Sequence, residues 1–256
     1  MFTEERREKI LEMLEEKGRV LAKDLASEFG LSIDSIRRDL TIMEEQALLK
    51  RTHGGAIPIG NVRTLPQPPS IRYGEGNAYQ NAIAKEAISY IQEGQTVFIG
   101  GASTHFVMLK YLPRNIQFTV VTNSVEVAYH LREVENIQTY LIGGYVKSSG
   151  NMTDAIANEL ARQFTIDVCF ATAGGLSEKG LSTATPEVAV FHKTVYDNSK
   201  KLVTLIEHSK FGVDMFIKMY PVEKLDVVIT DEETTQDKIE SMKVFGVEVV
   251  IANLEK

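Results

Sequence analysis

The segment SIDSIRRDLT, residues 32–41, places two adjacent arginines among short hydroxyl and acidic side chains. An arginine guanidinium can hold a guanine edge with two hydrogen bonds or bind a backbone phosphate, and a helix that carries it fits the major groove. A second basic group follows within KRTH, residues 50–53. The residues that we expect to contact DNA are Ser32, Asp34, Ser35, Arg37, Arg38, Thr41, Lys50, Arg51 and His53.

A second kind of chemistry is suggested by short glycine- and hydroxyl-rich segments that follow apolar runs, at 100–104, 122–124, 143–144 and 173–175. Glycine lets backbone N–H groups approach an anion, and hydroxyl groups add hydrogen bonds. Lys210, within SKFG, offers a positive charge after a further apolar run. Turns at the carboxyl ends of parallel strands converge on bound ligands, so these segments predict a shared anion-binding site.

Three helices and a hairpin must position the first group. The apolar spacing predicts helices over residues 4–17, with Ile10, Leu11 and Leu14 inward, and over 21–29, ended by Gly30. The expected inward residues of the second helix are Leu21, Leu25, Ala26 and Phe29, and those of the third are Ile33, Ile36, Leu40 and Met43. The third helix begins at Ser32, which suits an N-cap, and the chain then turns at Gly54-Gly55 as a small hairpin would. This arrangement is typical of a helix-turn-helix with a basic wing.

Strands and helices alternate in the larger part of the chain. The strand candidates are residues 96–100, 118–122, 138–143, 167–173, 201–206, 226–230 and 247–252. Val- and Ile-rich runs separated by segments of helix length indicate a parallel sheet that is buried on both faces. The fold class is therefore α/β, with an N-terminal winged helix-turn-helix (1–57), a Pro- and Gly-rich linker (58–77) and a Rossmann-like open parallel-sheet domain (78–256).

Composition restricts the function classes. The 256 residues are 43% hydrophobic and 25% charged, which excludes wholesale disorder, and no run of about 18 apolar residues predicts a membrane span. The charged N-terminus does not resemble a signal peptide, and a single cysteine excludes a disulfide framework. We therefore expect a cytoplasmic protein without a membrane partner. The net charge of −7 does not exclude DNA, because binding requires a local basic surface and not a basic average.

The N-terminal motifs resemble those of the DeoR-type bacterial transcriptional regulators. RREKILEMLEEKGRV is followed by LAKDLASEFGLSIDSIRRDLTIMEE and then RTHGGA, and the specific parts are the S-x-x-x-I-R-R-D-L core and the H-G-G-A wing. The resemblance implies a regulator of a sugar or related operon that binds double-stranded operator DNA. We expect this regulator to be a repressor. Symmetric operators usually require an even-numbered oligomer, so a homodimer or homotetramer is expected.

The order of the α/β segments resembles the effector domain of the same family, which is similar to ribose-5-phosphate isomerase. The resemblance implies a phosphorylated sugar or sugar derivative as effector. The expected effector-binding residues are Gly101, Ala102, Ser103, Thr104, Thr122, Asn123, Ser124, Gly143, Gly144, Gly174, His192 and Lys210. Within this set, Ser103, Thr104 and the adjacent backbone would bind phosphate, and Asn123 would bind a hydroxyl.

Several positions depart from the family pattern. Gly174 stands where an acidic residue is usual, His192 stands where a lysine is usual, and Glu207-His208 replaces an aspartate and a small residue. In the related isomerases carboxylates of this region transfer protons, which requires a positioned base. The missing carboxylate at Gly174 therefore argues against catalysis.

Two other functions are compatible with these residues. The first is a sugar-phosphate isomerase-like enzyme with a helical appendage, in which Glu187 would be the base. The second is a DNA-binding protein whose α/β domain only oligomerises, which would be indifferent to every sugar phosphate. We expect no catalytic residues and no cofactor. We also expect no metal site, because the five histidines show no close ligand pair.

Overall fold

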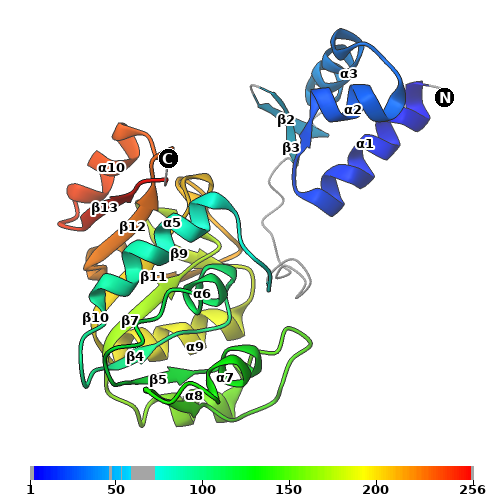
Figure 1. The fold of residues 1–256 in the computed structure, drawn as a ribbon. Helices are drawn as coiled ribbons and strands as arrows, with labels where there is room; N and C mark the ends of the chain where they lie inside the picture. The colour runs from blue at the N-terminus through cyan, green and yellow to red at the C-terminus, as the bar shows by residue number, and fades with distance from the viewer. Residues whose placement is uncertain (1–2, 46–47, 53, 59–72, 255–256) are drawn as a thin grey trace. The chain divides into compact units, whose positions relative to one another are not determined.

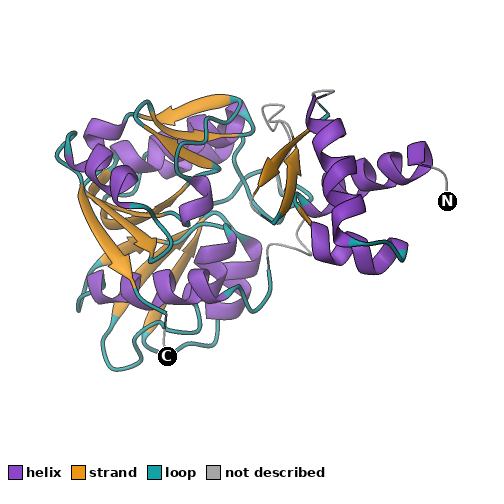
Figure 2. Ribbon diagram, turned by 90° about the horizontal axis from the view of Figure 1, so that it is seen from above, coloured by secondary structure: helices purple, strands orange, loops and turns teal. Residues whose placement is uncertain are grey.

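The computed structural model describes residues 3–45, 48–52, 54–58 and 73–254. The chain forms two compact units, 1–61 and 62–256, and each is described by itself (Figures 1 and 2). Most of the expected linker, residues 59–72, lies outside the described residues. No helix in the described part of the chain is long and apolar enough to cross a lipid bilayer.

The N-terminal unit packs three helices against a small antiparallel sheet. The helices are α1 (Thr3–Lys17), α2 (Ala22–Phe29) and α3 (Ile33–Glu45), and the strands are β1 (Val20–Leu21), β2 (Leu49–Thr52) and β3 (Gly55–Pro58). The strand order is β1-β3-β2, so the expected hairpin is present and β1 adds a strand that the sequence pattern did not predict. Gly30 ends α2 with a φ of 64°, a left-handed conformation that glycine adopts without steric cost.

The start of α3 is capped as expected, because the backbone N–H of Ser35 donates to Ser32 Oγ at 3.1 Å. Two predicted inward residues are wrong. Leu21 is 42% exposed because it belongs to β1, where it pairs with Gly55, and α2 begins one residue later. Ile33 is 41% exposed because it lies in the first turn of α3, outside the apolar cluster that Ile36 forms with its neighbours.

The second unit is built on a seven-stranded sheet in which every neighbouring pair is parallel. Its strands are β4 (Thr96–Phe98), β5 (Phe118–Thr122), β6 (Ile137–Leu141), β7 (Ile166–Thr172), β10 (Ser199–Leu205), β12 (Val227–Asp231) and β13 (Glu248–Ala252). All seven strand candidates are therefore confirmed, in the spatial order β13-β12-β10-β7-β4-β5-β6. The predicted α/β fold class is confirmed with them.

Helices cover both faces of this sheet (Figure 1). They are α5 (Ala78–Ala87), α6 (Ser103–Met108), α7 (Val125–Leu131), α8 (Ala155–Ala161), α9 (Pro186–Asp197) and α10 (Gln236–Lys243). The first three share one apolar cluster with Val97 and Val168, whereas the last three share the other with Phe98 and Cys169. Successive strand residues thus face opposite sides, which is why the strands read as continuous apolar runs.

A second, antiparallel sheet was not predicted. It consists of β8 (Gly175–Ser177), β9 (Gly180–Thr183) and β11 (Ile217–Tyr220), in the order β11-β9-β8. The expected glycine turn after β7 therefore leads into a hairpin and not directly into a helix. At Gly175 an added Cβ would lie 2.1 Å from the carbonyl oxygen of Val213, so this close approach requires glycine.

Candidate functional site

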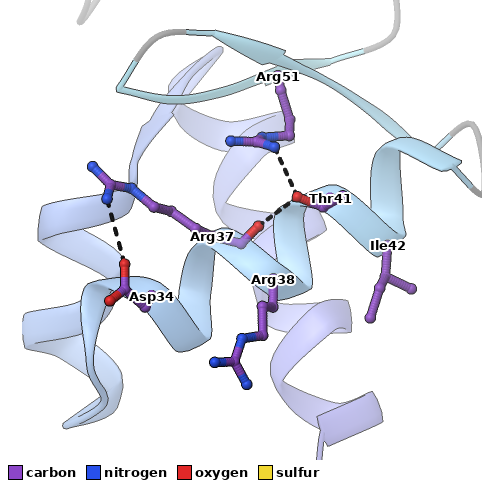
Figure 3. A pocket seen from close by; sticks show the side chains of 6 residues that line it. All are labelled: Asp34, Arg37, Arg38, Thr41, Ile42 and Arg51. Atoms are coloured by element: carbon purple, nitrogen blue, oxygen red, sulfur yellow. Dashed lines mark hydrogen bonds and ion pairs between the residues drawn. The ribbon is translucent and has the colours of Figure 1, made fainter.

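The exposed face of α3 carries the two arginines that the sequence singled out (Figure 3). Ile36, Leu40 and Met43 are buried on the opposite face, and this leaves Arg37 and Arg38 in solvent. Arg37 Nη1 lies 3.4 Å from Asp34 Oδ1, an exposed pair that contributes little to stability. The Arg38 side chain makes no hydrogen bond or ion pair with any other described residue. Both guanidinium groups are therefore available to a ligand such as DNA.

A chain of hydrogen bonds joins the wing to this helix. Arg51 Nη1, on β2, donates to Thr41 Oγ1 at 2.7 Å, and the Thr41 hydroxyl donates to the Arg37 carbonyl oxygen at 2.9 Å. The Arg51 backbone N–H donates to Glu44 Oε1 at 2.8 Å. The bonds fix β2 beside α3, and Figure 3 shows Arg37, Thr41 and Arg51 around one hollow with Asp34, Arg38 and Ile42.

Three more residues expected to contact DNA lie at the start of α3 and on β2. The hydroxyls of Ser32 and Ser35 are 2.9 Å apart at the start of α3, and Lys50 is exposed on β2. His53 lies outside the described residues. The structure thus places the arginines and the two serine hydroxyls on α3 or at its start, with the start of the wing bonded beside this helix through Arg51.

Asp39, inside the R-R-D-L motif, has a structural role that the sequence pattern did not predict. Its carboxylate is 4% exposed and accepts hydrogen bonds from Arg6 Nε at 2.8 Å and Arg7 Nη2 at 3.0 Å. These bonds attach α1 to α3 and use the charges of two arginines that would otherwise add to a basic surface. The sequence signal was an acidic residue beside Ile36 and Leu40 on the apolar stripe.

The second site is a cavity of about 440 Å³ at the carboxyl ends of the parallel strands. Residues that follow β4, β5, β6, β7 and β10 line it. β4 lies between β7 and β5, and the chain proceeds from β4 toward β6 on one side before crossing to β7 on the other. Ligands bind at such switch points in open α/β sheets, because the diverging connections leave a crevice.

The structure brings eight of the predicted effector-binding residues to this cavity. They are Gly101, Ala102, Ser103, Thr104, Asn123, Gly174, His192 and Lys210. The other four are not among its lining residues. Thr122 Oγ1 accepts the backbone N–H of Ser124, and the Ser124 hydroxyl caps α7. At Gly144 an added Cβ would meet Asp154 at 2.3 Å, and Gly143 packs near Leu160, so this pair faces α8.

The glycine turn after β4 also packs against neighbouring side chains. At Gly101 an added Cβ would lie 1.9 Å from Asn151 Oδ1, so glycine is required here because the Asn151 side chain packs against its Cα. The Ala102 N–H donates to His105 Nδ1 at 3.4 Å. The helix that follows, α6, has only six residues, so its dipole adds little to anion binding at this turn.

Two histidines near this turn are neutral. Burial lowers the pKa of His105 to about 4, and burial together with His105 lowers the pKa of His192 to about 3. His105 Nε2 donates to the Phe170 carbonyl oxygen at 2.7 Å. Tyr196 Oη donates its hydrogen to the Thr172 carbonyl oxygen. The hydrogen bond between His192 Nδ1 and Tyr196 Oη, at 3.3 Å, is therefore donated by His192 Nδ1. His192 Nε2 is then an unprotonated acceptor, and this side chain adds no charge to the cavity.

Several cavity residues were missed by the sequence reasoning. They are Lys147, Ser149, Asn151, Thr153, Thr172, Ala173, Thr183, Ala184, Thr185, Val188 and Met215. Many come from the segment after β6, which reaches the cavity because Asn151 forms an antiparallel bridge with Ser124. No local pattern in the sequence predicts such a bridge, since it joins two loops.

The electrostatics favour an anionic ligand. Lys147 and Lys210 line the cavity, and no aspartate or glutamate does among the described residues. Glu187, the base of the enzyme alternative, is exposed on α9 and is not a lining residue. The cavity therefore offers hydrogen bonds and positive charge but no carboxylate to move a proton, which fits ligand binding better than isomerisation.

Comparison with known proteins identifies the family. The DeoR C terminal sensor domain matches residues 77–232, more than half of the chain, and the DeoR-like helix-turn-helix domain matches residues 6–61. The HTH-type transcriptional repressor GlcR of Bacillus subtilis (strain 168) is 28% identical over 257 residues, which cover 100% of this chain and 99% of GlcR. The Lactose phosphotransferase system repressor of Lactococcus lactis subsp. lactis is 28% identical over 243 residues, which cover 94% and 95%.

Among solved structures, ribose 5 phosphate isomerase A from Neisseria gonorrhoeae is similar at 15% identity with a TM-score of 0.41, over 57% of each chain. The family matches confirm the resemblance expected from the sequence, and with it the expectation of a regulator and not an enzyme. The chain belongs to the DeoR family of DNA-binding transcriptional regulators.

Proposed function

We propose that this protein is a repressor of a sugar operon whose affinity for operator DNA changes when a phosphorylated sugar or sugar derivative fills the cavity after β4, β5 and β7. The observation that carries the proposal is a cavity with two lysines and no described carboxylate, in the same chain as a helix that exposes two arginines. Its relatives support it, because one of them is named a lactose phosphotransferase system repressor.

In this proposal each part of the chain has a separate function. Residues 1–57 bind DNA, residues 58–77 connect, and residues 78–256 bind the effector and assemble the protein. α3 enters the major groove, where Arg37 and Arg38 contact bases or phosphates, and β2 contacts the adjacent backbone. The protein acts in the cytoplasm as a homodimer or homotetramer, because a two-fold operator pairs with a two-fold protein.

The effector half of the proposal is tested by a thermal-shift screen of sugar phosphates against the corresponding unphosphorylated sugars. A ligand at 100 times its Kd stabilises the folded protein by about 2.7 kcal/mol, which is readily measured. We expect at least one sugar phosphate to raise the unfolding temperature, its parent sugar to have no effect, and the same compound to change operator affinity. If every sugar phosphate leaves both measurements unchanged, the α/β unit serves only in assembly.

A further inference from the structure

The two lysines of the cavity differ in how much of their charge is available. Lys210 Nζ lies 3.8 Å from Glu207 Oε1, and the Glu207 side chain is mostly buried. Asn77 and Gln80 of the α5 start donate to this carboxylate at 2.9 and 3.0 Å and hold it in place. A fixed carboxylate at this distance offsets the positive charge of Lys210, so a ligand anion gains less from it.

The ammonium group of Lys147 has no such compensation. Lys147 makes no side-chain hydrogen bond or ion pair with the other residues that the structure describes, although it lines the cavity. Since no described cavity residue is acidic and His192 is neutral, Lys147 provides the uncompensated positive charge of the site.

The backbone that carries Lys147 is held in a fixed turn. The Lys147 N–H donates to the Asn151 carbonyl oxygen at 3.2 Å, and the Gly150 N–H donates to the Lys147 carbonyl oxygen at 2.8 Å. Gly150 has a φ of 76°, which a residue with a side chain rarely adopts. Tyr73 Oη donates to the Ser149 carbonyl oxygen at 2.8 Å and ties the turn to the segment before α5. Only the lysine side chain remains to be ordered by a ligand, which lowers the entropic cost of binding.

Buried polar atoms in the same cavity point independently to a ligand. Asn123 Oδ1, Thr153 Oγ1 and Thr185 Oγ1 are buried without any hydrogen-bond partner in the described part of the chain. Asn123 is 1% exposed and its Nδ2 already donates to the Met152 carbonyl oxygen, so its Oδ1 requires a donor from elsewhere. Buried polar atoms without partners are costly, so a group that supplies hydroxyls here would be bound favourably.

We propose that Lys147 is the principal cation that binds the anionic group of the effector, and that the effector's hydroxyls pair with Asn123, Thr153 and Thr185. The ligand class is a phosphate monoester of a polyhydroxylated compound, and this assignment rests on the proposed function. In this assignment Lys210, which the sequence suggested as one anion contact, contributes less to binding the anionic group than Lys147 does.

The test compares three lysine variants under matched ionic strength. The probes are inorganic phosphate, a panel of pentose and hexose phosphates, and glucose as the uncharged control. Lys147→Met and Lys210→Met change the two cavity lysines, and Lys193→Met changes an exposed lysine of α9 that does not line the cavity. The unfolding temperature without ligand shows that each variant is folded, and Lys147→Arg restores the charge.

For the probe that stabilises the wild type most, we expect Lys147→Met to raise the Kd by roughly 10- to 100-fold, as the loss of a charge-assisted hydrogen bond does. Lys210→Met should raise it by less, Lys147→Arg should recover most of the affinity, and Lys193→Met should match the wild type. Unchanged affinity in Lys147→Met, or a larger loss in Lys210→Met, overturns the assignment of Lys147 while the effector role stands. If no phosphate compound binds even the wild type, both the assignment and the proposed effector class are wrong.

Discussion

At the scale of single residues, burial decides the charge state of the groups around the cavity. His105 is fully buried between the turn after β4 and the Phe170 carbonyl oxygen, and its pKa falls to about 4. The pKa of His192, at the cavity, falls to about 3, because of burial and because of the nearby His105. Both side chains are therefore hydrogen-bonding groups and not cations at neutral pH, which leaves the lysines as the positive charges.

This burial makes stability depend on pH in a defined window. Between pH 6.5, the ordinary pKa of histidine, and about pH 4, the unfolded chain binds a proton at His105 that the folded chain does not. In this window the free energy of unfolding should therefore fall on acidification by about 1.4 kcal/mol per pH unit because of His105. Above pH 7 the titration of His105 should have no effect on the free energy of unfolding. Urea unfolding followed by circular dichroism at pH 5 to 8 measures the slope.

The matched variant is His105→Gln, which keeps an N–H donor for the Phe170 carbonyl oxygen. We expect it to lose part of the slope between pH 5 and 6.5, whatever its effect on stability at pH 8. A slope equal to that of the wild type in this window would show that His105 is protonated in the folded protein.

At the scale of elements, α3 separates structural from exposed charge along a single helix. Asp39 points toward α1 and is paired with Arg6 and Arg7, whereas Arg37 and Arg38 point outward. Neighbouring residues of one sequence motif thus serve different purposes, because successive positions on a helix differ by about 100°. The wing is held beside the outward face through Thr41 and Arg51.

We expect Arg37→Ala and Arg38→Ala to weaken operator binding while leaving the N-terminal unit folded, since neither side chain is buried. A base contact should cost about 1–3 kcal/mol and relax specificity at one position, whereas a phosphate contact should reduce the dependence of affinity on salt. Fluorescence anisotropy at several salt concentrations, with a DNA site selected from a random-sequence pool, distinguishes the two. Lys193→Ala, on α9, is the control, and wild-type affinity in both arginine variants would exclude α3 as the contact.

At the scale of the whole molecule, the segment that begins at Tyr73 is hydrogen-bonded to a turn of the cavity wall and to Glu207, which lies beside Lys210. Tyr73 donates to Ser149 in the turn that carries Lys147, and Asn77 and Gln80 donate to Glu207 beside Lys210. A ligand bound by either lysine therefore lies beside groups that are hydrogen-bonded to the chain leading to the N-terminal unit. Effector and operator must affect each other's affinity equally, because the coupling free energy is shared.

Tyr73→Phe tests this attachment, because it removes the hydroxyl that bonds the turn and keeps the ring that contacts Phe106. We expect the effector-induced change in operator Kd to shrink about fivefold or more, and this loss to exceed any rise in the effector Kd measured by calorimetry without DNA. Tyr111→Phe is the control, since that hydroxyl donates to Asn81 and not to a cavity segment. Equal coupling in Tyr73→Phe and in the wild type would place the transmission elsewhere.

The sequence alone determined the order and type of the main elements. The Val- and Ile-rich runs located all seven parallel strands because buried parallel strands need apolar side chains on both faces. The spacing of Ile36, Leu40 and Met43 placed Arg37 and Arg38 outside, because helical periodicity is local. The turns after β4 and β5 were assigned to one site because strand ends in a parallel sheet meet at one edge.

Only the tertiary structure decided what depends on contacts between distant segments. Lys147 reaches the cavity through a bridge between Asn151 and Ser124, and Glu207 offsets Lys210. Gly101 makes room for the Asn151 side chain, and the Ala102 N–H donates to His105 Nδ1. Local spacing in the sequence predicts burial and secondary structure. The pairing of side chains with charges depends on packing between residues tens of positions apart. No local pattern in a single sequence encodes that pairing.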